Sequence, residues 1–138
     1  MTFSGVNYVA VVIAALAGFG LGAVWYMVLG GVWLRALGKT KGDFKYGSGA
    51  AKALPFIISI IALLIMATIL AGIMGHIGSV TIRGGVITGA LVWLGFVITT
   101  MGVDHAFSGA KPMLTLIDGA HWLAVLLIQG AVIGAFGV

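Results

Sequence analysis

Four long stretches of almost uncharged, apolar residues constrain the fold of this chain more than any other feature. They cover residues 6–34, 55–75, 86–103 and 112–138. A helix needs about 20 residues to cross the hydrocarbon core of a bilayer. The stretches are continuously apolar, whereas the strands of a membrane barrel alternate apolar and polar residues. The sequence therefore predicts an all-α integral membrane bundle of four transmembrane helices, over about 5–29, 55–75, 84–103 and 112–136, in a single domain, 1–138.

The composition excludes a soluble fold of this size. Hydrophobic residues make up 62% of the chain and charged residues only 7%, whereas soluble domains carry about 25% charged residues. The chain has no cysteine, which excludes a disulfide framework, a thiolate nucleophile and a Cys-based metal site. The formal charge of +4 arises mainly in one loop rather than in a soluble basic domain, so we expect the lipid bilayer, and not nucleic acid, as a partner.

The first apolar stretch is too long for one upright helix. Nearly 30 residues at a rise of 1.5 Å would extend roughly 43 Å, against a hydrocarbon core of about 30 Å. Gly30-Gly31 is the natural place for a break. We expect a spanning helix that ends at about Leu29, followed by a short interfacial helix that carries Trp33 and Arg35.

Two prolines and one short motif bear on the helix starts. Pro55 and Pro112 suit the first turn of the second and fourth helices, where the missing N–H of proline is not needed. The motif at 15–17 (ALA) resembles a signal-peptide cleavage site, but no basic residue precedes it and the apolar stretch continues far beyond it. We therefore expect the first helix to be retained.

Charge in the loops predicts the orientation. The loop 35–54 contains a single acidic residue, Asp43, and five basic residues: Arg35, Lys39, Lys41, Lys45 and Lys52. Lys111 falls on the same side of the membrane, and only Arg83 falls on the other. Because cytoplasmic loops are enriched in Lys and Arg, we expect the loop 35–54 in the cytoplasm and both termini outside.

Small residues recur every fourth position in three of the predicted helices, and such ladders are typical of close contacts between membrane helices. They are Ala10, Ala14, Gly18 and Gly22 in the first helix, Ala67, Ala71 and Gly75 in the second, and Gly130 and Gly134 in the fourth. The ladders fit either packing within the chain or dimerisation, and we expect packing within the chain.

Seven polar residues are expected to gather in the cytoplasmic half of the bundle: Tyr26, Thr99, Thr100, Asp104, His105, Asp118 and His121. Polar side chains are costly in lipid and usually face the bundle interior or a wet cavity. One interpretation is a proton-relay, ligand or metal site. The other, which we prefer, is a structural network in which Asp118 accepts a hydrogen bond from Tyr26 or a threonine. Two histidines and two carboxylates could supply metal ligands, but the sequence contains no Cys/His zinc spacing, and the spacing of these residues matches no catalytic motif.

Other side chains inside the predicted spans have simpler expected roles. Gln129 is expected to form a hydrogen bond between helices. Three tryptophans lie within the spans, as packing anchors or as contacts for a cofactor that the sequence does not identify: Trp25, Trp93 and Trp122.

Several segments together carry a family resemblance: 22–26 (GAVWY), 33–38 (WLRALG), 93–100 (WLGFVITT), 116–118 (LID) and Gly130. In order and spacing they resemble the domain-of-unknown-function family 1761 over nearly the whole chain. The resemblance implies a short, four-helix membrane protein without an assigned activity, of a mostly bacterial family, and hence a place in the bacterial cytoplasmic (inner) membrane. It also implies that five residues occupy family positions: Trp25, Tyr26, Thr99, Thr100 and Asp118.

The chain departs from the family pattern at two places. Members often carry Ser-Pro after the Trp-Tyr pair, where this chain has Met27-Val28. His105 and His121 look like features of this chain, which weakens the interpretation of the polar residues as a metal site.

We therefore expect a non-enzymatic membrane protein that associates with itself or serves as an accessory subunit of a larger membrane assembly. The alternative is a small oligomeric transporter or channel that uses the polar residues around Asp118. A membrane enzyme acting on lipid is the third interpretation.

Overall fold

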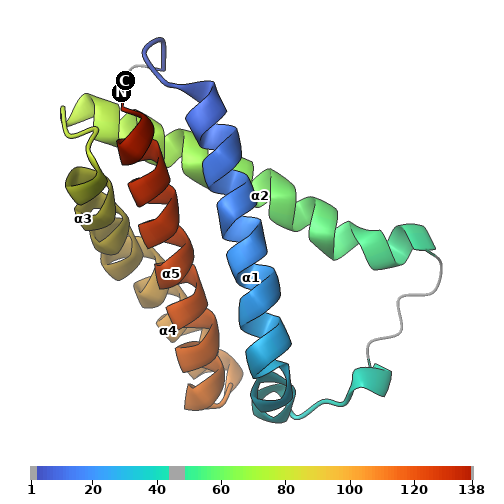
Figure 1. The fold of residues 1–138 in the computed structure, drawn as a ribbon. Coiled ribbons are helices and arrows are strands. Elements are labelled where there is room, and N and C mark those ends of the chain that lie inside the picture. The colour runs from blue at the N-terminus through green and yellow to red at the C-terminus, as the bar shows by residue number, and fades with distance from the viewer. Residues whose placement is uncertain (1–2, 44–48, 138) are drawn as a thin grey trace.

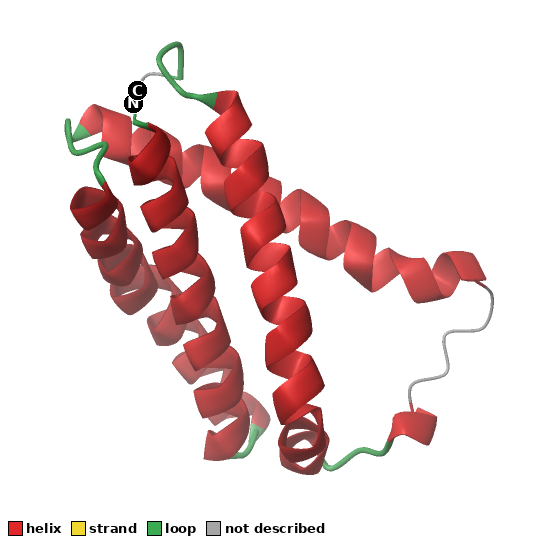
Figure 2. Cartoon of the chain, viewed as in Figure 1, coloured by secondary structure: helices red, strands yellow, loops and turns green. Residues whose placement is uncertain are grey.

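The computed structural model describes residues 3–43 and 49–137, and helices make up most of them (Figures 1 and 2). The helices are α1 (Tyr8–Leu37), a short 3₁₀ helix (Lys41–Asp43), α2 (Gly49–His76), α3 (Ile82–Val92), the π-helical segment η2 (Trp93–Val97), α4 (Ile98–Ser108) and α5 (Pro112–Phe136). Because α3, η2 and α4 are continuous, the described residues form four helices long and apolar enough to cross a membrane. The described residues include no strand. The all-α, four-helix prediction is confirmed.

The first helix does not break at its glycine pair. α1 is helical from Tyr8 to Leu37, through Gly30 and Gly31, and ends at Gly38, whose φ of 70° is the left-handed conformation common after helices. The prediction that the helix ends at about Leu29 is therefore wrong. Glycine weakens a helix by about 1 kcal/mol per residue, but the backbone has no other hydrogen-bond partner in lipid. Figure 1 shows the last turns of α1 end-on, so the helix bends there instead of ending.

The two prolines differ in their positions. Pro112 is at the start of α5, as predicted, and α5 runs to Phe136. Pro55, in contrast, lies inside α2, which begins at Gly49. The prediction that Pro55 opens this helix is wrong, because a helix can lose a single backbone hydrogen bond near its end and still continue toward the loop.

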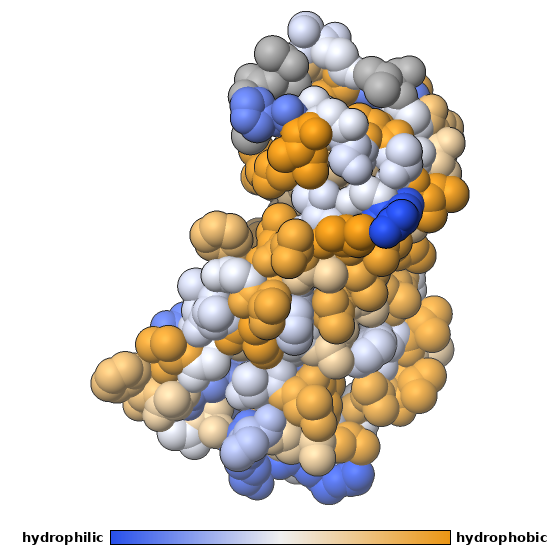
Figure 3. Space-filling model, turned by 90° about the vertical axis from the view of Figure 1, so that its left-hand side faces the viewer, coloured by the Kyte–Doolittle hydropathy of each residue, from blue (hydrophilic) through white to orange (hydrophobic). Residues whose placement is uncertain are grey.

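The helices are unevenly packed. α1 and α5 lie next to each other, and α3 and α4 pack against α5. α2 crosses this group of helices and diverges from it toward the N-terminal end of α2 (Figure 1). The buried residues of α2 begin only at Leu63. The start of α1 and the end of α5 lie at the same end of the bundle (Figure 1). Apolar side chains cover most of the face in Figure 3, with a hydrophilic patch at its lower end, as expected for a surface in contact with lipid.

The closest helix contact joins α3 and α5 through glycines. A Cβ atom added to Gly85 would meet the backbone of Gly130, and one added to Gly130 would meet the backbone of Gly85. A Cβ at Gly89 would lie 2.5 Å from the carbonyl oxygen of Leu126, and one at Gly134 would meet the backbone of the α2–α3 loop. The predicted ladder of α5 thus packs within the chain. Gly85 and Gly89, spaced by four residues, form the matching pair on α3, which the sequence analysis did not identify.

The small residues of α1 also face this chain. Ala10 and Ala14 are fully buried, with 0% of their surface exposed. A Cβ added to Gly18 would lie 3.1 Å from Leu63 and 3.3 Å from Val125. α1 therefore approaches both α2 and α5 along the face that carries its small residues. In α2, Ala67 and Ala71 are buried, whereas Gly75 has open space around it.

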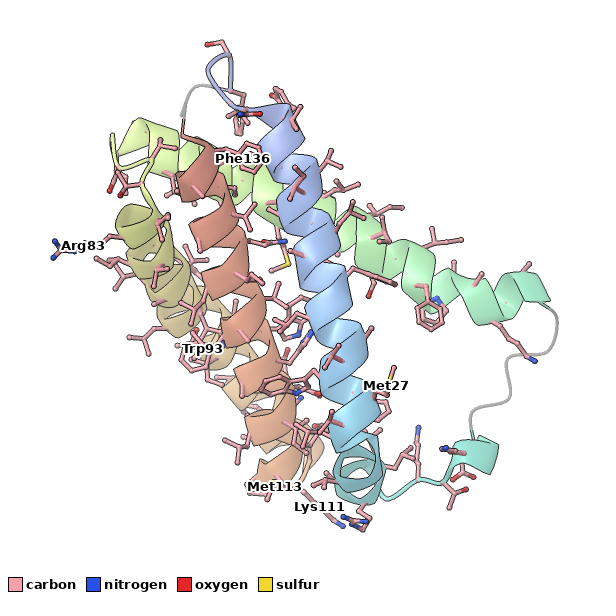
Figure 4. The ribbon with its side chains drawn as sticks, in the orientation of Figure 1. Met27, Arg83, Trp93, Lys111, Met113 and Phe136 are labelled. Carbon is pink, nitrogen blue, oxygen red and sulfur yellow. The ribbon has the colours of Figure 1, made fainter. Side chains whose placement is uncertain are left out.

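Basic residues mark one end of the bundle. Lys111 Nζ donates a hydrogen bond to the backbone oxygen of Arg35 at 3.4 Å, which joins the ends of two predicted cytoplasmic loops. Figure 4 shows Lys111 at this end and Arg83 near the other. In the 3₁₀ turn, hydrogen bonds from the backbone and hydroxyl of Thr40 lower the pKa of Asp43. Lys45 lies outside the described residues.

Candidate polar site and intramembrane pocket

One hydrogen bond joins the first and last helices in the interior of the bundle. Tyr26, on α1, donates its hydroxyl to Oδ1 of Asp118, on α5, at 2.6 Å, and the bond is partly buried. This is the contact that the structural interpretation of the polar residues predicts. It gives the Asp118 carboxyl a donor inside the membrane, where an unpaired polar group would be costly.

His121 lies one turn beyond Asp118 and is surrounded by aromatic rings. Its side chain is only 7% exposed, and its ring centroid lies 5.0 Å from that of Tyr26 and 4.6 Å from that of Trp122. A Cβ atom added to Gly22 would come within 3.0 Å of Nε2, so this glycine leaves room for the imidazole. Nδ1 is buried and has no hydrogen-bond partner among the described residues.

A pocket of about 420 Å³ adjoins His121. It lies between α1, α2 and α5, near the place where α2 diverges from the bundle (Figure 1). Its walls include side chains of all three helices: Phe19 and Tyr26 from α1, Phe56 and Ser59 from α2, and His121 and Trp122 from α5. Tyr26 therefore connects the pocket to Asp118.

The predicted tryptophans have different surroundings. Trp93 Nε1 donates to the backbone oxygen of Gly119 at 2.8 Å and so anchors η2 on α5 (Figure 4 labels Trp93). Trp122 packs edge-on against His121. Trp25 lies farther from His121, at 6.3 Å between centroids, and its buried Nε1 has no partner in the described chain.

Three predicted site residues do not join Tyr26, Asp118 and His121. Thr99 and Thr100 are exposed, and their hydroxyls donate to backbone oxygens of the preceding turn, at 2.9 Å and 2.7 Å. Asp104 is exposed on α4. These side chains therefore lie on the outer surface of the bundle.

His105 forms a separate pair. Its Nδ1 lies 2.6 Å from Oγ1 of Thr115, which connects α4 to α5. The sequence analysis did not single out Thr115, although it lies one turn before Asp118 on the same helix. Within the described residues, no group of three or more His, Cys, Asp or Glu side chains is placed to hold a metal ion.

A family model described as "Protein of unknown function (DUF1761)" matches residues 9–134. The chain belongs to the DUF1761 family. The matched range contains Tyr26, Asp118 and His121, and it contains every helix except the ends of α1 and α5. No curated protein and no solved structure matches this DUF1761 chain.

A further polar contact connects α2 and α5 in this DUF1761 protein. Gln129 is fully buried, and its Nε2 donates to the backbone oxygen of Leu63 at 3.2 Å. The predicted hydrogen bond between helices is confirmed. Because Leu63 lines the pocket and is also the first buried residue of α2, this contact holds α2 to the bundle at the edge of the pocket.

Proposed function

We propose that this protein is a non-enzymatic membrane component that associates laterally with a second copy of itself. The observation that carries the proposal is a face of α4 and η2 that has small and polar residues and no close neighbour among the described residues. Association as an accessory subunit of a larger assembly would use the same face.

The face consists of Gly95, Thr99 and Gly102, on successive turns. Thr99 lies directly over Gly95, because its hydroxyl donates to the Gly95 oxygen. Cβ atoms added to Gly95 or Gly102 would meet nothing within 4 Å, whereas the glycines of α3 contact the α5 backbone. Neither η2 nor α4 contains a buried residue. The stripe thus has the composition of a helix contact, but no helix of the described part of the chain packs on it.

The physical chemistry of lipid favours covering such a face. Burial of apolar surface does not drive helices together in a bilayer, so association depends on close backbone packing at small residues and on polar contacts between helices. The Gly95–Gly102 stripe allows that close approach. Asp104, exposed two residues beyond Gly102, is a costly group in lipid unless it reaches the interface or a partner.

Cysteine cross-linking in membranes tests the association directly, because the chain has no native cysteine. We expect Gly102→Cys to form a disulfide-linked dimer on mild oxidation. The matched control is Gly20→Cys, on α1, which also has open space around it and should remain monomeric. Equal cross-linking of the two variants, or none in either, would refute association through α4.

We further propose that the protein resides in a bacterial cytoplasmic membrane with both termini outside. What supports this orientation is the cluster of basic residues at one end of the bundle, joined by the Lys111–Arg35 contact, since positive loops remain in the cytoplasm.

Labelling with a membrane-impermeant thiol reagent tests the orientation. In intact cells we expect Ile77→Cys, in the α2–α3 loop, to react, and Gly42→Cys, in the basic loop, to react only after the membrane is opened. The reverse pattern would show the opposite orientation.

A further inference from the structure

Two polar side chains of the intramembrane pocket have no partner. His121 is more than nine-tenths buried, forms no hydrogen bond within the described chain, and lines the pocket. Ser59, on the opposite wall, likewise has no hydrogen bond to the described residues. A buried polar group left unpaired destabilises the fold, because it has lost its hydrogen bonds to water and gained none in return. The unpaired imidazole of His121 therefore points to a bound molecule that would supply the missing partner. Ser59, which is partly exposed on the pocket wall, offers a second hydrogen-bonding group to such a molecule.

The remaining walls are aromatic or small. Phe19, Phe56 and Trp122 line the pocket with aromatic rings, and Gly22 lines it without a side chain. Phe56 is 62% exposed, so the pocket is open at the side of the bundle, between α1 and α2. A ligand would reach it from within the lipid.

The charges beside the pocket restrict the ligand. Its described lining contains no Lys or Arg, so a carboxylate or phosphate would have no cationic partner there. The nearest acidic group, Asp118, lies behind Tyr26 and accepts that hydroxyl. An acidic ligand is therefore disfavoured, and a neutral one with hydrogen-bonding oxygens fits His121 and Ser59.

We propose that this pocket binds an uncharged, ring-bearing lipid whose ring carries hydrogen-bonding oxygens, the chemical class of the membrane quinones. The ring would pack against Trp122 and the phenylalanines, with its oxygens at His121 and Ser59, and its tail would leave through the open side. The volume of about 420 Å³ lies within the usual range of roughly 300–1,000 Å³ for small-molecule sites. This proposal is independent of self-association, which uses α4.

Titration of decylubiquinone into the protein in nanodiscs, followed by quenching of tryptophan fluorescence, tests the proposal. We expect saturable quenching by the wild type. His121→Phe keeps a ring but removes both nitrogens, and Ser59→Ala removes the hydroxyl. Each change should weaken binding by about tenfold, the effect of losing one hydrogen bond.

Two controls make the result specific. His76→Phe changes a histidine at the exposed end of α2, away from the pocket, and should leave the affinity unchanged. Palmitate, a carboxylate with a similar tail, should not displace the quinone. Quenching that does not saturate, equal affinity of Ser59→Ala and the wild type, or displacement by palmitate would each overturn the assignment. Ser59→Ala keeps the test decisive if His121→Phe fails to fold.

Discussion

Replacement of Gly130 by alanine is expected to destabilise the bundle by roughly 3 kcal/mol or more, the upper part of the range for overpacked cores. The new Cβ would stand against the carbonyl group of Gly85. Backbone atoms of two packed helices cannot move aside as the end of a flexible side chain can. α3 and α5 would have to separate along their whole contact, which includes Gly89 and Leu126. Unfolding by SDS titration in mixed micelles measures the effect.

The matched control is Gly20→Ala on α1, where an added Cβ meets nothing within 4 Å. Its free energy of unfolding should stay the same or rise slightly, because alanine favours a helix over glycine by up to about 1 kcal/mol. Equal stability of Gly130→Ala and Gly20→Ala would show that α3 and α5 are not in backbone contact.

The positions of the helices could be predicted well from the sequence because lipid imposes one simple requirement. Every spanning segment must be apolar and must pair its own backbone groups, so long uncharged runs identify the spans directly. The fourth helix matches its prediction from Pro112 to Phe136. The exact ends of the helices were less predictable, because a backbone in lipid stays helical where a backbone in water would not. In water-soluble proteins, a glycine pair and a proline are typical of helix ends. Here Gly30-Gly31 and Pro55 nevertheless lie inside helices.

The candidate site was only partly predictable, because of a local change in helix geometry. The predicted clustering of Thr99, Thr100 and Asp104 with Asp118 assumes regular α-helical turns. In η2, the N–H of Ile98 bonds instead to the oxygen of Trp93, five residues earlier. Such a turn inserts one residue, which rotates the following helix by about 100°. Thr99, Thr100 and Asp104 therefore face outward. No simple sequence pattern predicts a π-helical turn.

The pocket was not predictable either, because it depends on tertiary structure. Phe56 and Ser59 lie in a continuous apolar run, which predicts a transmembrane helix and nothing more. They become pocket walls only because α2 diverges from α1 before Leu63, where its packing begins. Sequence periodicity identifies the face of a helix but not the angle at which two helices cross.

Tyr26→Phe is expected to lower the free energy of unfolding by roughly 1–2 kcal/mol. Hydrogen bonds between membrane helices contribute about 1–2 kcal/mol in model peptides and about 0.6 kcal/mol on average in a folded membrane protein. A buried acceptor that is left unpaired adds to the loss. The change removes the donor of the 2.6 Å bond and leaves the Asp118 carboxyl unpaired in the bundle. The loss should appear in the same SDS titration as a lower midpoint with an unchanged slope.

A double-mutant cycle separates the hydrogen bond from the packing of the ring. Asp118→Leu alone leaves the Tyr26 hydroxyl without an acceptor and should also destabilise the bundle. Combined with Tyr26→Phe, it removes both partners, so the double variant should be more stable than the sum of the two losses predicts. Asp118→Asn keeps an acceptor at this position and should cost less than Asp118→Leu. Strict additivity of Tyr26→Phe and Asp118→Leu would mean that the contact does not link α1 to α5 energetically, and that the tyrosine is held by its aromatic neighbours alone.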